Sequence, residues 1–388
     1  MENFVYSIPT TVYFGKDQLQ NLGPELCAKG KKVLLVYGGG SIKRIGLYDA
    51  VLDMLKQNEL VCVELGGVEP NPRITSVREG VRLCKEHHID MVLAVGGGSS
   101  IDCAKAISAG ACYDGDPWDL VTDHSKIKNV LPVFAVLTLA ATGSEMDAGG
   151  VITNFDTNQK MAISNPALKP IASVMDPTYT FTVPAYHTAA GTADIMSHTL
   201  ENYFTRTESA FFQRRMAEGV LKTCIHYGPV AMEQPDNYEA RANLMWASSW
   251  AINGLLKLGT NCAWSVHSME HELSAFYDIT HGVGLAILTP HWMRYVLDET
   301  SETIFAEYGV NVWNIDPSLP KREIAEKAID ATAQFFQKEL KLPATLREVG
   351  IGEENFERMA KKAAIGKLEK AFRPLSWEDV VNIYQASL

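Results

Sequence analysis

Four short and almost uninterrupted apolar runs near the start of the chain restrict its fold more than any other feature of the sequence. Segments with helical spacing follow the first three runs, and strands that are apolar on both faces and alternate with helices are typical of a parallel sheet covered on both sides. The sequence therefore predicts a doubly wound α/β domain. The apolar runs are KVLLVYGGG (32–40), LVCVELGG (60–67), IDMVLAVGGG (89–98) and VLPVFAVLTL (130–139). The helical segments between them are 47–58, 74–88 and 99–111.

The second half of the chain has a different character. After the breakers Pro177 and Pro184, long segments with helical periodicity follow one another, with few β-branched runs between them. A chain of 388 residues also exceeds the size at which a single hydrophobic core stops growing. We therefore predict two domains, an α/β domain over 1–180 and an all-helical domain over 181–388. The predicted helical segments are 185–205, 209–227, 238–257, 262–276 and 322–340.

The composition argues against several kinds of partner. A formal net charge of −11 disfavours broad binding to nucleic acid or anionic membranes, because both depend on Lys and Arg side chains that neutralise phosphates. No apolar stretch is long enough to predict a membrane span, and MENFVYSIPT lacks the features of a signal peptide. Seven cysteines without a C-x-x-C pair indicate neither a disulfide framework nor a thiolate zinc site. We expect a cytoplasmic protein with no nucleic-acid or membrane partner.

Glycine-rich turns follow two of the apolar runs. Gly38, Gly39 and Gly40 end one run, and Gly96–Ser99 joins another to a helix. Glycine lets backbone N–H groups approach an anion, and a helix N-terminus offers free donors, so the second turn is a candidate pyrophosphate site. Neither turn matches a named phosphate-binding motif, and a tight turn without a ligand is the alternative. Two such turns on neighbouring strands favour a nucleotide at the strand ends. A third loop, LTLAATGSEMD (137–147), offers further hydroxyl donors.

Histidines and one aspartate form the second candidate site. His267 and His271 are four residues apart, as are Asp194 and His198, so each pair lies on one face of a helix. His281 belongs to the same cluster only if a turn near YDIT (277–280) brings it back. Aspartate and imidazole donors suit Zn²⁺ or Fe²⁺ with a position left for substrate or water. The alternative for each histidine taken singly is a hydrogen-bonded core residue. His271 is either a further ligand or a proton relay.

These motifs together resemble the iron-containing, or group III, alcohol dehydrogenases, in particular their NADPH-dependent butanol dehydrogenase and aldehyde reductase branch. The resemblance extends along nearly the whole chain. The spacing D-x-x-x-H combined with H-x-x-x-H, nine residues and a further H is its most specific part. The matching stretches are FGKDQL, GGGSSIDCAKAIS, TLAATGSEM, DIMSHTLENYF and HSMEHELSAFYDITH.

The resemblance implies a Rossmann-like N-terminal domain (1–180) that binds the dinucleotide and an all-α C-terminal domain (181–388) that holds metal and substrate. It also implies a homodimer and a role for His271 in catalysis. The implied metal ligands are Asp194, His198, His267 and His281. The implied cofactor contacts are Gly97, Gly98, Ser99 and Asp102 at the pyrophosphate, Thr138, Thr142 and Ser144 in the next loop, and Lys160 near the nicotinamide ribose.

The first glycine turn bears on the choice of nucleotide. An Asp in this turn accepts a hydrogen bond from the ribose 2′-OH of NAD and repels the 2′-phosphate of NADP. Here the turn contains Gly38, Gly39 and Ser41 instead, and Lys43 and Arg44 follow it. A 2′-phosphate would therefore meet hydroxyl, amide and cationic donors, so the sequence predicts NADP(H).

The predicted function is reversible hydride transfer between NADP(H) and a primary alcohol or aldehyde, with one divalent metal, Fe²⁺ or Zn²⁺. One departure from the family pattern is Asp147, at a position where many relatives have Asn. Two alternatives stay open: a polyol dehydrogenase or dehydroquinate synthase-like enzyme of the same superfamily, and a nucleotide- and metal-binding sensor without turnover.

Overall fold

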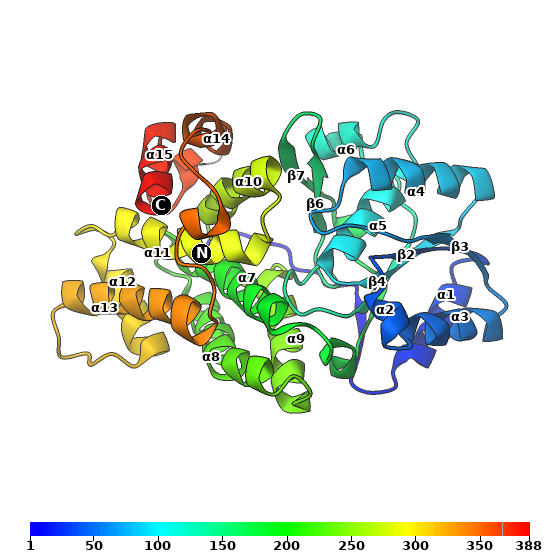
Figure 1. Ribbon diagram of the computed structural model, residues 1–388, viewed down its shortest axis with the longest axis horizontal. Coiled ribbons are helices and arrows are strands. Elements are labelled where there is room, and N and C mark those ends of the chain that lie inside the picture. Colours follow the sequence, from blue (N-terminus) through cyan, green and yellow to red (C-terminus); the bar gives the residue numbers. More distant parts are fainter. Residues whose placement is uncertain (367) are drawn as a thin grey trace. The chain divides into compact units, whose positions relative to one another are not determined.

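The computed structural model describes residues 1–366 and 368–388. The chain folds into two compact units, each built from more than one segment (Figure 1). The sheet unit comprises Ser7–Val183 and Pro235–Asn253. The helical unit comprises Met1–Tyr6, Pro184–Gln234 and Gly254–Leu388.

A six-stranded parallel sheet forms the centre of the sheet unit, with the strand order β1-β8-β5-β4-β2-β3 (Figure 1). In this register Val36 lies opposite Ala94, and Ala94 lies opposite Ala135, so β2, β4 and β5 are direct neighbours. Since all pairs are parallel, the loops after these three strands emerge at the same edge of the sheet. The strands are β1 (Thr11–Phe14), β2 (Lys32–Tyr37), β3 (Val61–Leu65), β4 (Met91–Gly96), β5 (Val133–Leu137) and β8 (Ala172–Met175).

Alternation of side chains along each strand feeds two separate cores. In β2, Val33 and Leu35 pack with α1 (Leu22–Cys27) and α3 (Leu47–Gln57). Leu34 and Val36 point the other way and pack with α4 (Ile74–His87) and α5 (Gly98–Ala111). All four side chains are fully buried. A strand buried on both faces needs apolar residues at every position, which is why the sequence shows runs instead of alternation. The predicted doubly wound arrangement is confirmed.

The sequence pattern does not predict every element of the sheet unit, and it places the predicted helix 238–257 in the C-terminal domain. The hairpin of β6 (Gly149–Asn154) and β7 (Gln159–Ser164) is antiparallel and lies outside the main sheet. Helix α9 (Tyr238–Ile252) belongs to the sheet unit although it lies far along the chain. Its Met245 joins the core beneath α4 and α5, and Trp246 packs edge-on against Phe14. The remaining short elements are α2 (Ser41–Arg44) and α6 (Trp118–Thr122).

The described part of the helical unit contains helices and no strand, as the sequence predicts. Each segment with helical periodicity corresponds to an observed helix, and Pro229 and Pro290 lie inside helices without ending them. The helices are α7 (Ala185–Tyr203), α8 (Phe211–Glu233), α10 (Ser265–Tyr277), α11 (His281–Val296), α12 (Glu302–Trp313), α13 (Lys321–Gln334), α14 (Phe356–Ala363) and α15 (Trp377–Ala386).

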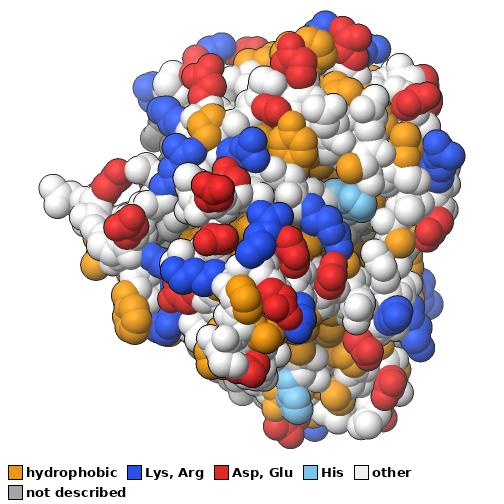
Figure 2. Space-filling view, turned by 90° about the vertical axis from the view of Figure 1, so that its left-hand side faces the viewer, with side chains coloured by type: hydrophobic (Ala, Val, Ile, Leu, Met, Phe, Trp, Pro, Cys, Tyr) orange, Lys and Arg blue, Asp and Glu red, His pale blue; other side chains and the backbone are white. Residues whose placement is uncertain are grey.

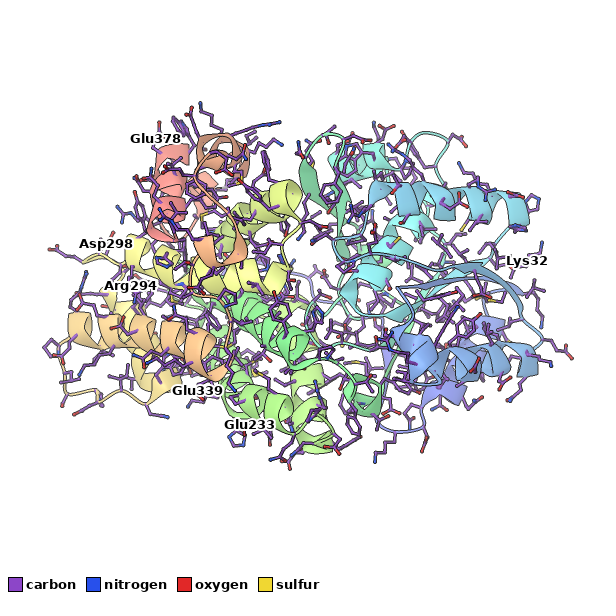
Figure 3. All side chains as sticks on the ribbon, in the orientation of Figure 1. Lys32, Glu233, Arg294, Asp298, Glu339 and Glu378 are labelled. Atoms are coloured by element: carbon purple, nitrogen blue, oxygen red, sulfur yellow. The ribbon has the colours of Figure 1, made fainter. Side chains whose placement is uncertain are left out.

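Positive and negative side chains intermix on the face of the molecule drawn in Figure 2. Glu233, Arg294 and Glu378 are among the charged residues on the outside of the helical unit (Figure 3). Arg294 there pairs with Asp330 at 2.6 Å. None of the described helices is both long and apolar enough to cross a bilayer.

Helices α7 and α11 approach each other closely enough that their backbones touch. A Cβ placed on Gly282, the second residue of α11, would lie 2.0 Å from the carbonyl oxygen of Ala190 in α7. No side chain fits at that distance, and backbone cannot yield as a flexible side chain does. Gly282 therefore sets how near α11, with His281 at its start, comes to α7.

We expect Gly282→Ala to lower the free energy of unfolding by about 1–3 kcal/mol, because the added methyl group overpacks this crossing. The matched control is Gly219→Ala in α8, where an added Cβ meets nothing within 4 Å. That substitution should stabilise by about 0.4–1 kcal/mol through reduced entropy of the unfolded chain. Urea unfolding followed by circular dichroism measures both. Equal and stabilising effects of the two substitutions would contradict the close crossing.

Candidate active site

Helix α7 carries the first half of the histidine cluster. It begins after Pro184, and nearly all of its residues from Thr188 to Tyr203 are buried. Small residues such as Ala189, Ala190 and Ala193 allow neighbouring helices to approach it from several sides. Asp194 and His198 lie one turn apart on this helix and are 2% and 4% exposed, so both have left water almost completely.

Helices α10 and α11 supply the second half of the cluster. His267 and His271 lie on α10, which ends at Tyr277, and Asp278 adopts a left-handed conformation with φ of 51°. This turn reverses the chain, so that α11 begins at His281 and returns that side chain to the other histidines. The turn expected near YDIT is confirmed.

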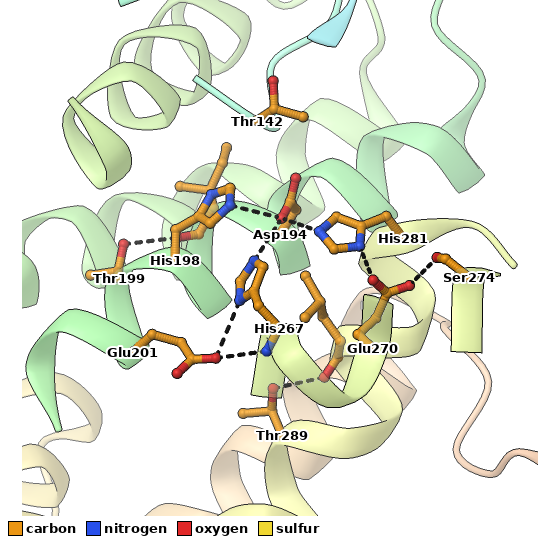
Figure 4. Close-up of polar contacts among 12 residues, drawn as sticks. Thr142, Asp194, His198, Thr199, Glu201, His267, Glu270, Ser274, His281 and Thr289 are labelled. Carbon is orange, nitrogen blue, oxygen red and sulfur yellow. Dashed lines mark hydrogen bonds and ion pairs between the residues drawn. The ribbon is translucent and has the colours of Figure 1, made fainter. Parts of the chain in front are cut away.

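The histidine rings converge on one carboxylate oxygen (Figure 4). Asp194 Oδ1 lies 3.4 Å from His198 Nε2, 3.8 Å from His267 Nε2 and 3.7 Å from His281 Nε2. The rings of His198 and His267 stack with their centroids 4.8 Å apart. Ligands arranged tetrahedrally at the usual zinc–nitrogen distance are roughly 3.3 Å apart, close to these separations.

The cluster also has the polar atoms that a cation would satisfy. Asp194 Oδ1 and His267 Nε2 are buried and have no hydrogen-bond partner among the described residues. Buried polar atoms normally have partners, so such atoms require an explanation. Asp194, His267 and His281 can offer three ligand atoms that all lie within 4.8 Å of one another. The donor set and its spacing therefore fit a metal ion.

The electrostatics of the cluster favour a positive charge at its centre. Burial alone would raise the pKa of Asp194, but His198, His267 and His281 hold that pKa well below its usual range. Burial alone would lower the pKa of His267, but the neighbouring carboxylates of Asp194 and Glu201 raise that pKa to about 9. A divalent cation supplies the same positive charge in the same place.

His271 stands at the side of the cluster. Its ring centroid lies 5.6 Å from that of His281 and 6.2 Å from that of His267. Together with Glu270 and His281 it forms a second group whose ligand atoms lie within 4.8 Å of one another. The side chain is partly exposed, unlike His267. This position suits an exchange of protons with solvent.

Three side chains that the sequence analysis did not single out contact the histidines. Glu201 accepts a hydrogen bond from His267 Nδ1 at 3.2 Å, and Glu270 accepts one from His281 Nδ1. The ring of Trp264 lies edge-on to both His198 and His267. Glu201 falls seven residues after Asp194, two helical turns along the same face. That spacing is the signal that could have identified it.

The predicted cofactor residues belong to the sheet unit, and most lie at one edge of its sheet. Gly38, Gly39 and Ser41 follow β2; Gly97, Gly98 and Ser99 follow β4; Thr138, Thr142 and Ser144 follow β5. Because β2, β4 and β5 are parallel neighbours, their three loops come together. Gly97, the N-cap residue of α5, provides no side-chain cap. Uncapped helix N-termini at the strand ends are where parallel α/β folds bind phosphates.

Close contact fixes two of these loops to each other. A Cβ on Gly98 would lie 2.2 Å from Thr142 Oγ1, so only glycine fits beside that loop. By contrast, a Cβ on Gly39 would meet nothing within 4 Å. Lys160 lies on β7, where its Nζ donates to Asn71 Oδ1 at 2.9 Å.

A buried ionic network lies beneath the loop that follows β5. Asp102 on α5 accepts hydrogen bonds from Ser144 Oγ at 2.6 Å and from the backbone N–H of Val151 at 2.8 Å. Lys105, one turn further along α5, is 0% exposed and also donates to Ser144 Oγ. Its Nζ donates in addition to the carbonyl oxygens of Asp147 and Gly149. Asp102 and Ser144 are thus bonded to each other within this network.

Asp147, the departure from the family pattern, takes part in a turn. Its Oδ2 accepts a hydrogen bond from the backbone N–H of Gly149 at 2.9 Å. Burial lowers the pKa of the neighbouring Lys105, while the charges of Asp147, Asp102 and Glu145 oppose that shift. The extra carboxylate therefore contributes to holding the Lys105 side chain in its buried position.

A Rossmann-like parallel sheet, together with helices that gather histidines around one aspartate, is typical of enzymes that combine a nucleotide with a metal ion. Two family models match the chain: "Iron-containing alcohol dehydrogenase" over residues 9–177, and "Fe-containing alcohol dehydrogenase family, C-terminal" over residues 188–388. The chain belongs to the iron-containing alcohol dehydrogenase family.

Individual relatives agree with this assignment. The chain is 56% identical over 394 residues to NADH-dependent butanol dehydrogenase B of Clostridium acetobutylicum, covering 100% of both chains. It is 39% identical to the NADPH-dependent aldehyde reductase YqhD of Escherichia coli, covering 93% of each. A solved structure titled NADH-dependent butanol dehydrogenase A, from Thermotoga maritima, matches with a TM-score of 0.94 and 39% identity, covering 100% of this chain and 99% of the other. The names of these relatives include both nucleotides.

We expect Lys105→Met to lower the free energy of unfolding by about 3–5 kcal/mol, because it leaves the buried Asp102 and two carbonyl oxygens without their cationic partner. The full chain is unfolded with denaturant, and hydrogen exchange of the amides in the sheet unit measures the loss of stability there. Lys222→Met on the exposed face of α8 is the control and should change stability little. A buried lysine that could be replaced without cost would contradict the network described here.

Proposed function

We propose that this protein is a metal-dependent alcohol dehydrogenase that transfers hydride reversibly between NADP(H) and primary alcohols or aldehydes of the butanol and butanal class. Family membership supports alcohol oxidation in general. The observation that carries the metal-dependent part is the convergence of three imidazole Nε2 atoms on the buried Oδ1 of Asp194. The names of the relatives, butanol dehydrogenases and an aldehyde reductase, favour this substrate class.

In this proposal Asp194, His198, His267 and His281 hold one divalent metal, Fe²⁺ or Zn²⁺. When bound, the metal supplies a Lewis acid for the substrate oxygen and the nicotinamide supplies or accepts the hydride. His271 delivers the proton that alcohol formation requires from a ring nitrogen, and it recovers that proton from water on its exposed side. The partial exposure of His271 and its position beside His281 support this role.

The sheet unit binds the dinucleotide in this proposal, and the helical unit binds metal and substrate. The pyrophosphate is held by backbone N–H groups of Gly97, Gly98 and Ser99, assisted by the loop that contains Thr138 and Thr142. Ser144 and Asp102 act together to hold that loop, as their mutual hydrogen bond supports. Lys160 and the turn of Gly38, Gly39 and Ser41 complete the proposed cofactor contacts.

We further propose that two copies of the chain form a homodimer. Strand β1 lies at the edge of the sheet and pairs with β8 on one side only among the described strands. An open strand edge of this kind is a site at which a second chain can pair. The cytoplasmic location stays a prediction.

Loss of NADPH absorbance with butanal tests the proposed reaction. We expect metal-stripped protein to be inactive, and we expect turnover to return when Fe²⁺ or Zn²⁺ is restored. Glycerol with NADP⁺, followed by the gain of NADPH absorbance and compared with butanol under the same conditions, separates a polyol dehydrogenase from the proposed enzyme. Nucleotide that binds without being oxidised by any substrate or metal combination would instead identify a sensor and overturn the proposal.

Gly39→Asp tests the choice of nucleotide. The side chain fits, since an added Cβ meets nothing within 4 Å, and its carboxylate would repel a 2′-phosphate. We expect the ratio of kcat/KM for NADPH to that for NADH to fall about tenfold or more, equivalent to about 1.4 kcal/mol. Gly39→Asn, which adds the same shape without charge, should change the ratio far less. Equal effects of the two variants would show that the turn does not contact the 2′ position.

A further inference from the structure

Two buried carboxylates lie behind the candidate metal ligands, on the side away from Asp194. Glu270 is 0% exposed and Glu201 is 5% exposed. Each accepts a hydrogen bond from the Nδ1 atom of one histidine, Glu270 from His281 and Glu201 from His267 (Figure 4). The Nε2 atoms of the same two rings face Asp194. The ring of His267 therefore lies between Glu201 and Asp194, and the ring of His281 lies between Glu270 and Asp194.

The position of Glu270 is fixed from several sides. Ser274, one turn further along α10, donates from its Oγ to Glu270 Oε1, while Oε2 accepts from His281. Gly284 on α11 leaves the space that this side chain occupies, because a Cβ there would lie 2.8 Å from Glu270 Cγ. A serine, a histidine and a glycine from two helices thus define one orientation of the carboxylate.

Burying this carboxylate costs free energy that an apolar side chain would not. Ion pairs in protein interiors are often no more stabilising than well-packed hydrophobic residues of similar size. Stability alone therefore does not account for a charged residue at 0% exposure in this position. A carboxylate that accepts from Nδ1 does have a specific effect: it fixes the tautomer and the ring orientation, so that Nε2 is free to act as a ligand.

We propose that Glu270 is a positioning residue that orients His281 toward the metal and raises its basicity as a ligand, and that Glu201 does the same for His267. This inference rests on the proposed function, since it assumes that the cluster binds a divalent metal. On this proposal metal affinity depends on α7, α10 and α11 together. Glu201 on α7 contacts His267 on α10, and Glu270 on α10 contacts His281 at the start of α11.

Glu201 has a second task, which makes it the less decisive residue to test. Its Oε1 also accepts from the backbone N–H of His267 at 2.8 Å. This N–H belongs to the first turn of α10, where the residue at the N-cap position, Trp264, provides no side-chain cap. Glu201 therefore also caps α10, and its removal would disturb the helix as well as the imidazole.

The experiment compares Glu270→Leu with Glu270→Gln in the full chain. Zn²⁺ affinity is measured by competition with a chromophoric chelator, and the visible absorption spectrum of the Co²⁺-loaded protein reports the ligand geometry. We expect the Leu variant to bind Zn²⁺ about 10- to 100-fold more weakly and to show an altered Co²⁺ spectrum. The Gln variant should recover most of the affinity, because its amide oxygen still accepts from Nδ1.

Glu218→Gln is the matched control. Glu218 is also buried in the helical unit, at 7% exposure, but it accepts from Tyr203 and Arg215 instead of a histidine. This variant should lower the melting temperature and leave Zn²⁺ affinity unchanged. Metal-free Glu270→Leu should also melt at a lower temperature, because Ser274 and His281 lose their buried acceptor. The loss of Zn²⁺ affinity, which Glu218→Gln should not show, therefore distinguishes positioning from a general structural role.

Three results would overturn the inference. Wild-type Zn²⁺ affinity in both Glu270 variants would show that the carboxylate does not act on the metal site, while metal binding by the wild type would leave the proposed function intact. Equal and complete loss of metal in both variants would make Glu270 a direct ligand. A wild type that binds no Zn²⁺, Fe²⁺ or Co²⁺ would instead remove the proposed function on which the inference rests.

Discussion

The carboxylate of Asp194 is buried in the middle of a buried helix, and the packing of α7, α10 and α11 depends on compensating its charge. An isolated charge at 2% exposure would be unstable, because desolvation disfavours the charged form. Three imidazoles from α7, α10 and α11 supply the compensating field. They can do so only because α11 passes close to α7 at Gly282 and because the left-handed turn at Asp278 returns the chain. Packing and electrostatics at this point therefore depend on each other.

The sheet unit also contains a buried ionisable side chain, but oxygen atoms and carboxylates surround it instead of imidazoles. Lys105 is completely buried, and it is surrounded by carbonyl and hydroxyl oxygens and by the nearby carboxylates of Asp102 and Asp147. These contacts join α5 to the loop after β5, and the contact of Gly98 with Thr142 joins the same two segments from the other side. A loop held at both points is preorganised, so a ligand at the strand ends would not have to order it on binding.

The sequence predicts those parts of the fold that depend on local pattern. Strand β2 is buried on both faces, and its apolar run and the glycines after it follow directly from that burial. Asp194 and His198 are four residues apart because side chains at that spacing lie on one face of a helix. Contacts between distant segments leave no such pattern in the sequence. Helix α9 joins the sheet unit through the buried Met245 and the exposed Trp246, and neither residue differs in the sequence from those of any amphipathic helix. The β6–β7 hairpin could not be predicted from the sequence either, because its strands are stabilised by pairing with each other and lack a strong hydrophobic pattern.

The histidine and aspartate cluster could be predicted because its members repeat at helical spacing, whereas the carboxylates behind it could not. Glu270 lies between His267 and His271 in the sequence, where a glutamate on a helix is ordinarily a solvated surface residue. Its burial becomes evident only once α11 places Gly284 against it. The same limit applies to Asp102, which matches a cofactor-binding motif but whose hydrogen bonds to Ser144 and Val151 depend on loops distant in sequence.

The turn after β2 has neither of the two features that would select one nucleotide strongly. Discrimination against NADPH needs a repelling carboxylate, and this turn has none. Strong discrimination against NADH needs a cation reserved for the 2′-phosphate, yet Lys43 Nζ already lies over the rings of Tyr48 and Tyr37, at 4.5 Å and 5.2 Å. Both tyrosine hydroxyls in turn donate to Glu64. On our proposal a 2′-phosphate competes with these contacts for Lys43, so the preference for NADP(H) is moderate and depends on salt concentration.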